Sequence, residues 1–208
     1  MRQRKRTRLI GYDYAAPGGY FITAVVKDRL SVFGEIRNGR CLLNPFGQIV
    51  ADQWQWLHDR YLYLTMDEFV VMPNHIHGII NIADCVDNRS VGNSRDCSLQ
   101  DNDPSPDHHA QQKTKSLSEL IGAFKTTSSK RIHRSGLPSF QWQTSFYERI
   151  IRNYGELTRI REYIQTNPLR WELDIENPRH LPDVGNGRDR SLQIHSVQDY
   201  YGKIIEPL

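Results

Sequence analysis

Cysteine is scarce in this sequence, and long apolar runs are missing. The 208 residues include three cysteines, an odd number without CxxC spacing, so neither a disulfide framework nor a cysteine zinc site is expected. The apolar stretches, such as residues 22–26 and 69–72, fall far short of the roughly 18 residues that a membrane-spanning helix requires. The basic N-terminus is not followed by the apolar segment of a signal peptide. We therefore expect a cytoplasmic protein.

Acidic side chains are absent from the first eight positions, which hold five basic ones. Residues 113–134 hold six basic side chains against the single acid Glu119, although the net charge of the whole chain is only +3. Such clusters can displace counterions from nucleic-acid phosphates, and they can equally be a solvated helix face and a loose tail. On the first interpretation the protein is associated with the nucleoid, and these side chains contact backbone phosphates: Arg2, Arg4, Lys5, Arg6, Arg8, Lys125, Lys130 and Arg131.

The hydrophobic pattern changes period along the chain. Runs rich in β-branched and aromatic residues predict strands, and apolar residues three or four positions apart predict helices. Ser116 and Glu119 have the spacing of a helix-starting capping box. Strands that do not alternate regularly with helices favour an α+β fold, an antiparallel sheet covered by helices. The expected order is paired strands over 19–37, a helix over 46–63, strands over 68–72 and 75–82, a helix from 117, an extended segment over 140–151 and a helix over 154–166.

One long stretch interrupts this pattern. Residues 83–115 are rich in Asp, Asn, Ser, Gln and Pro and have no hydrophobic period, which favours a disordered insertion. The chain is then expected to consist of a basic arm over 1–18, one domain over 19–174 that carries the insertion, and a tail over 175–208.

Two histidines stand two residues apart in the strand expected over 75–82. Successive side chains in a strand alternate between faces, so His75 and His77 project to one side and Ile76 to the other. Neutral imidazoles suit a divalent transition metal, but alternating histidines are also common as ordinary half-exposed positions. A metal site therefore needs support from other residues.

The helix expected to end near Asn167 offers that support. Tyr163 and Asn167 are four residues apart and share one helical face. A carboxamide oxygen suits Mg²⁺ or Mn²⁺, and a His-His-Asn set carries no negative charge, so the cation keeps its field for a phosphate. A phenol, with a pKa of about 10, is a poor nucleophile unless a nearby cation favours the phenolate. Tyr163 is therefore the candidate nucleophile. Tyr147 and Tyr154 are rivals without a carboxamide four residues on.

Three separate blocks resemble one family in the right order. They are VVMPNHIHGI at 70–79, WQTSFYERIIR at 142–152 and REYIQTNP at 161–168. They resemble the single-tyrosine HUH transposases, and above all the REP-associated tyrosine transposases. The resemblance covers about residues 4–174 except the insertion. Where the second block usually has a histidine, this chain has Arg149.

The resemblance implies a ferredoxin-like fold and a mechanism. It implies that His75, His77 and Asn167 hold Mg²⁺ or Mn²⁺ and that Tyr163 cleaves and rejoins single-stranded hairpin DNA, REP-like elements included, through a 5′-phosphotyrosine. Such a protein acts as a monomer or a homodimer. Two alternatives stay open: a module of the same fold that binds hairpins without cutting, and a metal-dependent hydrolase that uses the histidine pair. A covalent protein–DNA adduct separates the first interpretation from the other two.

Overall fold

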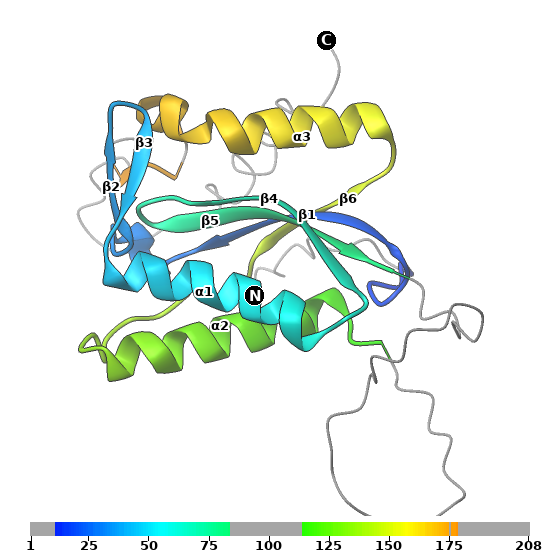
Figure 1. The fold of residues 1–208 in the computed structure, drawn as a ribbon, viewed down its shortest axis with the longest axis horizontal. Helices are drawn as coiled ribbons and strands as arrows, with labels where there is room; N and C mark the ends of the chain where they lie inside the picture. Colours follow the sequence, from blue (N-terminus) through cyan, green and yellow to red (C-terminus); the bar gives the residue numbers. More distant parts are fainter. Residues whose placement is uncertain (1–10, 84–113, 175, 179–208) are drawn as a thin grey trace, which may run out of the picture.

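The protein is described by a computed structural model that covers residues 11–83, 114–174 and 176–178 (Figure 1). Its centre is a four-stranded antiparallel sheet whose strands, from edge to edge, are β4 (Leu64–Val71), β5 (His75–Ile82), β1 (Gly18–Val25) and β6 (Tyr147–Ile151). The α-helices are α1 (Pro45–Arg60), α2 (Leu117–Arg134) and α3 (Tyr154–Thr166), and two 3₁₀ segments are η1 (Lys27–Arg29) and η2 (Asn167–Leu173). A separate hairpin consists of β2 (Gly34–Arg37) and β3 (Arg40–Leu43).

The chain order β1-α1-β4-β5-α2-β6 makes two interlocked split βαβ units. Strand β5 lies between β1 and β4 and is antiparallel to both, and β1 lies in the same way between β5 and β6. Helices α1 and α2 cover one face of the sheet, and α3 covers the other (Figure 1). The predicted ferredoxin-like α+β fold is confirmed.

The core on the α1 and α2 face follows the alternation of the strands. Ile22 and Ile76 from the two central strands pack there, fully buried, with Leu57 of α1 and Phe124 of α2. Burying side chains of this size stabilises the fold by roughly 1.5–3 kcal/mol each. The alternate residues of the same strands face α3, where the functional side chains lie.

A close approach explains the glycine that follows the histidine pair. The ring of Trp54 on α1 stacks on Phe69 of β4, with 4.7 Å between the ring centroids. A Cβ atom at Gly78 would lie 2.5 Å from that Trp54 ring. Any side chain at position 78 would therefore push α1 away from the strand that carries the histidines.

Helix boundaries agree with the local sequence signals. Ser116 accepts a hydrogen bond from the Glu119 backbone N–H while the Glu119 carboxylate accepts one from the Ser116 backbone, so the predicted capping box is present. Asn44 caps α1 through the N–H groups of Phe46 and Gly47. Helix α3 ends at Thr166, just before the Asn167–Pro168 pair, as predicted.

The prediction that residues 19–37 form paired strands is wrong. Strand β1 pairs with β5 and β6, whereas residues 34–37 pair with β3. Two left-handed residues, Asp28 and Arg29, lead the chain away from β1, and Asn38–Gly39, also at positive φ, is the centre of the second hairpin. Asn38–Gly39 therefore forms the turn between two short strands, β2 and β3, and neither strand pairs with β1. Strand β4 also begins at Leu64, earlier than the expected residue 68.

Several expectations lie outside the described residues. They concern the phosphate-contacting side chains Arg2 to Arg8, most of the insertion expected over 83–115, and the tail beyond Pro178. Part of the expected arm is described: Tyr12 and Tyr14 pack against the core, and the Leu117 N–H donates to the Tyr14 carbonyl. Among the described helices, none is long and apolar enough to cross a membrane.

Candidate active site

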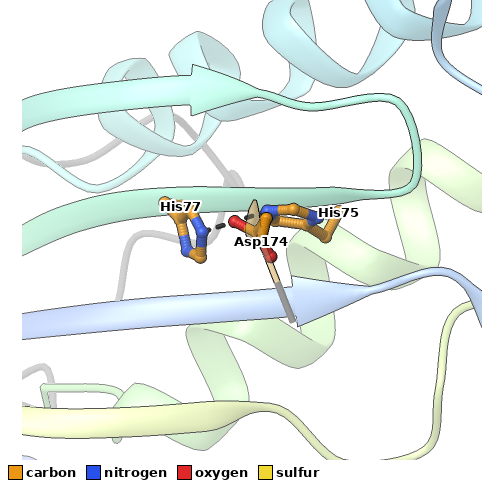
Figure 2. A group of neighbouring side chains, drawn as sticks. All are labelled: His75, His77 and Asp174. Carbon is orange, nitrogen blue, oxygen red and sulfur yellow. Dashed lines mark hydrogen bonds between the residues drawn. The ribbon is translucent and has the colours of Figure 1, made fainter. Parts of the chain in front are cut away.

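The register between β1 and β5 places both histidines on the face that α3 covers. His77 lies opposite Thr23, and His75 lies opposite Val25. Both imidazoles are fully buried, and their Nε2 atoms are 3.0 Å apart. Figure 2 shows the two rings side by side on β5 with Asp174 against them. The same-face geometry expected from the strand pattern is therefore present.

Burial keeps both histidines neutral. Desolvation lowers the pKa of His75 to about 4; the Asp174 carboxylate opposes this shift and the Arg29 guanidinium adds to it. Desolvation also holds the pKa of His77 well below its usual value, with a further lowering by His75. A neutral imidazole has a lone pair for a metal ion, so the pair is in its ligand form at neutral pH.

We expect the metal-free protein to lose stability between pH 6.5 and 4. Unfolded histidines take up protons near pH 6.5, whereas buried His75 resists protonation down to about pH 4, so the unfolded state binds more protons in this window. The lowered folded-state pKa thus means stability that is present above pH 6.5 and lost as the pH falls. At pH 5 the loss from His75 alone is ~2 kcal/mol. Denaturant unfolding at pH 7 and pH 5 measures it.

A matched pair of variants isolates this effect. His75→Gln should lose less stability than the wild type on going from pH 7 to pH 5. His58→Gln should not, because His58 is half-buried outside the site, where its ring bonds to the Leu64 carbonyl. An equal loss in both variants would assign the pH dependence to other groups.

Helix α3 carries Tyr163 into the same site. The helix is fixed to β4 by a bidentate ion pair between Arg161 and Asp67, at 2.8 and 2.6 Å, and by a hydrogen bond from Gln165 to Glu68. Tyr163 is 3% exposed, and its hydroxyl oxygen lies 3.2 Å from His77 Nε2. The predicted nucleophile is therefore in direct contact with one of the two predicted histidines.

The rival tyrosines lie elsewhere. Tyr154 begins α3 and is 75% exposed. Tyr147 lies on the same sheet face as the site but packs edge-on against Phe21, and burial raises its pKa. Arg149, at the position where the resembled family has a histidine, forms an ion pair with Glu156 at the start of α3.

Asp174 lies beside the histidines, and Asn167 is hydrogen-bonded to Asp174. Asn167 is 1% exposed and donates from Nδ2 to Asp174 Oδ2 at 2.9 Å. Its Oδ1 atom is buried and has no hydrogen-bond partner among the described residues. Ligand atoms of His75, His77 and Asp174 all lie within 4.8 Å of one another. Sequence reasoning missed Asp174, because it follows the 3₁₀ turn η2 in a stretch without pattern.

A buried network holds Asp174 over the site. Arg29 Nε donates to Glu176 Oε2 at 2.6 Å, Asn74 Nδ2 donates to the Glu176 carbonyl at 2.7 Å, and the Glu176 N–H donates to Asp174 Oδ1 at 2.7 Å. Both histidines are fully buried.

These residues fit a divalent cation. Two neutral imidazole nitrogens 3.0 Å apart, a carboxylate within 4.8 Å and an unsatisfied carboxamide oxygen form a mixed nitrogen and oxygen donor set. With Asp174 the set carries one negative charge, whereas the His-His-Asn set expected from the sequence carries none. The unsatisfied Asn167 Oδ1 is the strongest indication that a cation binds here, since buried polar atoms nearly always have a partner.

Lys125 does not lie as its predicted role requires. Its ammonium is bound by two backbone carbonyls, of Gln143 at 2.8 Å and Ser145 at 2.7 Å, and burial lowers its pKa to about 8. The phosphate contact expected for it is therefore not supported. Lys130 and Arg131, further along α2, are exposed.

Comparison with known proteins yields one close relative. An uncharacterized protein of Haemophilus influenzae is 34% identical over 178 residues, which cover 84% of this chain and 93% of the relative. The chain belongs to one family with this Haemophilus protein. No protein-family model matches this chain.

Two solved structures are similar in fold. One is a REP-associated tyrosine transposase bound to a REP hairpin, with a TM-score of 0.49 and 19% identity, covering 92% of this chain and 96% of that one. The other is a Deinococcus radiodurans protein provisionally described as a transposase, with a TM-score of 0.37 and 14% identity, covering 76% and 95% of the two chains.

Proposed function

We propose that this protein cleaves and rejoins single-stranded hairpin DNA with Tyr163 as the nucleophile. The observation that carries the proposal is the contact of the Tyr163 hydroxyl with His77 Nε2 at 3.2 Å, in a site where His77 Nε2 is also 3.0 Å from His75 Nε2. A phenol, a pair of neutral imidazoles and an unsatisfied carboxamide oxygen are the parts that a metal-dependent phosphoryl transfer to tyrosine requires.

The reaction balances without an energy-rich cofactor. The Tyr163 oxygen loses its proton and bonds to the scissile phosphorus, while the bond from phosphorus to the 3′ oxygen breaks and that oxygen takes up a proton. The product is a 5′-phosphotyrosine and a free 3′-hydroxyl. Because the number of phosphoester bonds is unchanged, a 3′-hydroxyl can reverse the step and rejoin a strand.

His75, His77 and Asn167 would hold the divalent cation, with Asp174 as a further candidate ligand. When bound, the cation supplies charge stabilisation for the phosphate and favours the phenolate. Phe21 meets the Tyr163 ring edge-on at 6.1 Å, and the ion pair between Arg161 and Asp67 fixes the helix, so the chain itself orients the phenol.

The substrate class rests on the motif resemblance alone. Hairpin single-stranded DNA, REP-like elements included, is what the three sequence blocks imply. A metal-dependent hydrolase is the second candidate function, because Asp174 supplies the carboxylate beside the histidines that such an enzyme needs. The position of Tyr163 against His77 favours strand transfer over hydrolysis.

A labelled hairpin tests the proposal directly. The full-length protein is incubated with single-stranded hairpin DNA labelled at its 3′ end, with Mn²⁺ or Mg²⁺, and run on a denaturing gel. Strand transfer predicts a labelled band at the mass of protein plus DNA, because the 5′ phosphate of the labelled fragment stays on Tyr163. Hydrolysis would release both fragments free, and a non-cleaving module would bind the hairpin in a native gel and leave it intact.

Deleting residues 2–8 should weaken DNA binding and flatten its salt dependence. Each phosphate contact on a single strand contributes a slope of roughly 0.7 in the logarithm of affinity against that of salt. The preferred hairpin should not change, since phosphates carry no direct sequence information. Lys125→Met is the matched control and should leave the slope unchanged, because two carbonyls already bind its ammonium. An unaltered slope in the truncated protein would mean that the arm does not touch DNA.

A further inference from the structure

Two side chains behind the histidines determine which ring nitrogens can bind a cation. We infer that Asn74 fixes the tautomer of His75, and that the Thr23 hydroxyl lets His77 exchange its tautomer when a cation binds. The inference rests on the proposed metal site and concerns residues that do not themselves touch the metal. Partners of this kind fix ring orientation and commonly change metal affinity 10- to 100-fold.

The argument for Asn74 begins with its amide nitrogen. Nδ2 donates to two backbone carbonyls, of Arg29 at 3.0 Å and Glu176 at 2.7 Å. The amide therefore cannot be flipped, because its oxygen would then face two other oxygens. Asn74 Oδ1 must face His75 Nδ1, at 2.8 Å, and can only accept. His75 consequently carries its hydrogen on Nδ1, and its Nε2 lone pair faces the site.

This assignment decides the state of His77 without metal. His75 Nε2 is bare and lies 3.0 Å from His77 Nε2, a distance that requires a hydrogen between the two atoms. The hydrogen must be on His77 Nε2, which also points to the Tyr163 oxygen at 3.2 Å. His77 Nδ1 is then bare and accepts from the Thr23 hydroxyl at 2.8 Å. Thr23 is thus the donor in this state.

If His75 and His77 hold the proposed cation through their Nε2 atoms, His77 must adopt the opposite tautomer. Its hydrogen would then reside on Nδ1 and donate to Thr23 Oγ1. A hydroxyl can donate or accept by rotating one bond, so Thr23 serves both states without any heavy atom moving. The exchange also withdraws the Nε2–H from Tyr163. Metal loading therefore changes the hydrogen bonding of the nucleophile through Thr23 and His77.

Substitutions at Thr23 test this role by metal binding rather than by activity. Thr23→Val keeps the shape of the buried side chain but removes the hydroxyl, and Mn²⁺ binding, measured by titration with electron paramagnetic resonance, should weaken about 10- to 100-fold. Thr23→Ser should restore it. Thr65→Val, at an exposed position of β4 in the same sheet, is the matched control and should bind as the wild type does. Equal Mn²⁺ affinity in Thr23→Val and wild type would overturn the inference.

A second measurement reads the tautomers directly. In ¹⁵N-histidine spectra of the metal-free wild type, His75 should carry its hydrogen on Nδ1 and His77 on Nε2. Adding diamagnetic Mg²⁺ should move the His77 hydrogen to Nδ1 and leave His75 unchanged. A His77 already protonated on Nδ1 without metal would disprove the exchange. If the wild type bound no cation at all, the proposed metal site would fail, while the metal-free spectrum would still decide the tautomers.

Discussion

Tyr163→Phe should abolish the covalent protein–DNA adduct while hairpin binding stays near the wild-type level. The variant loses only the hydroxyl oxygen that lies 3.2 Å from His77 Nε2. The ring keeps its edge-on contact with Phe21 and its place beside Ile160 and Ile164, so the fold of α3 should be preserved. Removing a nucleophile outright costs far more than removing a supporting contact, and adduct formation should fall by at least about 10³-fold. Denaturing gels measure the adduct, and native gels measure binding.

The two rival tyrosines supply matched controls for this result. Tyr147→Phe removes a half-buried hydroxyl on the same sheet face, and Tyr154→Phe removes an exposed one on the same helix. Both variants should form the adduct at rates close to the wild type. An adduct that persisted in Tyr163→Phe and disappeared in either control would move the nucleophile to that residue and exclude the proposed geometry.

Local patterns predict most of the elements that build this site. Alternation in β5 is enough to place His75 and His77 on one face. The capping box and the Asn167–Pro168 pair likewise mark the helix ends. These features depend on residues close in sequence, which is why they can be predicted from it.

Features that depend on distant residues could not be predicted in the same way. Asp174 reaches the histidines because Asn74 and Arg29, about a hundred and more positions earlier, hold Glu176 beside it. No local pattern in the chain marks that contact. The contacts of Lys125 likewise depend on residues outside its helix, since the carbonyls that bind it come from a segment 18 to 20 residues later. The number of basic side chains in a segment does not show which of them form hydrogen bonds within the protein.

Removing either histidine should eliminate metal-dependent cleavage. His75→Ala or His77→Ala takes away one of two nitrogen donors that lie 3.0 Å apart, so Mn²⁺ affinity should fall by more than the 10- to 100-fold that outer partners cost. In the wild type, Mn²⁺ should support cleavage at least as well as Mg²⁺, because imidazole nitrogen matches Mn²⁺ better. Titration with Mn²⁺ and the adduct assay measure the two effects. His75→Gln retains more of the buried volume than His75→Ala and serves as a control for misfolding. A cooperative thermal melt shows that each variant is folded.

Controls and ligand variants complete this test. His133→Ala should bind metal and cleave normally, since His133 lies on α2 and bonds to the Phe140 carbonyl. Asn167→Ala and Asp174→Ala then identify the third ligand, which is the residue whose substitution causes the larger loss of Mn²⁺ affinity. The unsatisfied Asn167 Oδ1 favours Asn167, because a buried oxygen without a partner gains most from a cation. Full adduct formation in excess chelator, or in both histidine variants, would exclude a metal role. An adduct that forms in excess chelator but is lost in His77→Ala would mean that His77 itself activates Tyr163, through the contact already present between them.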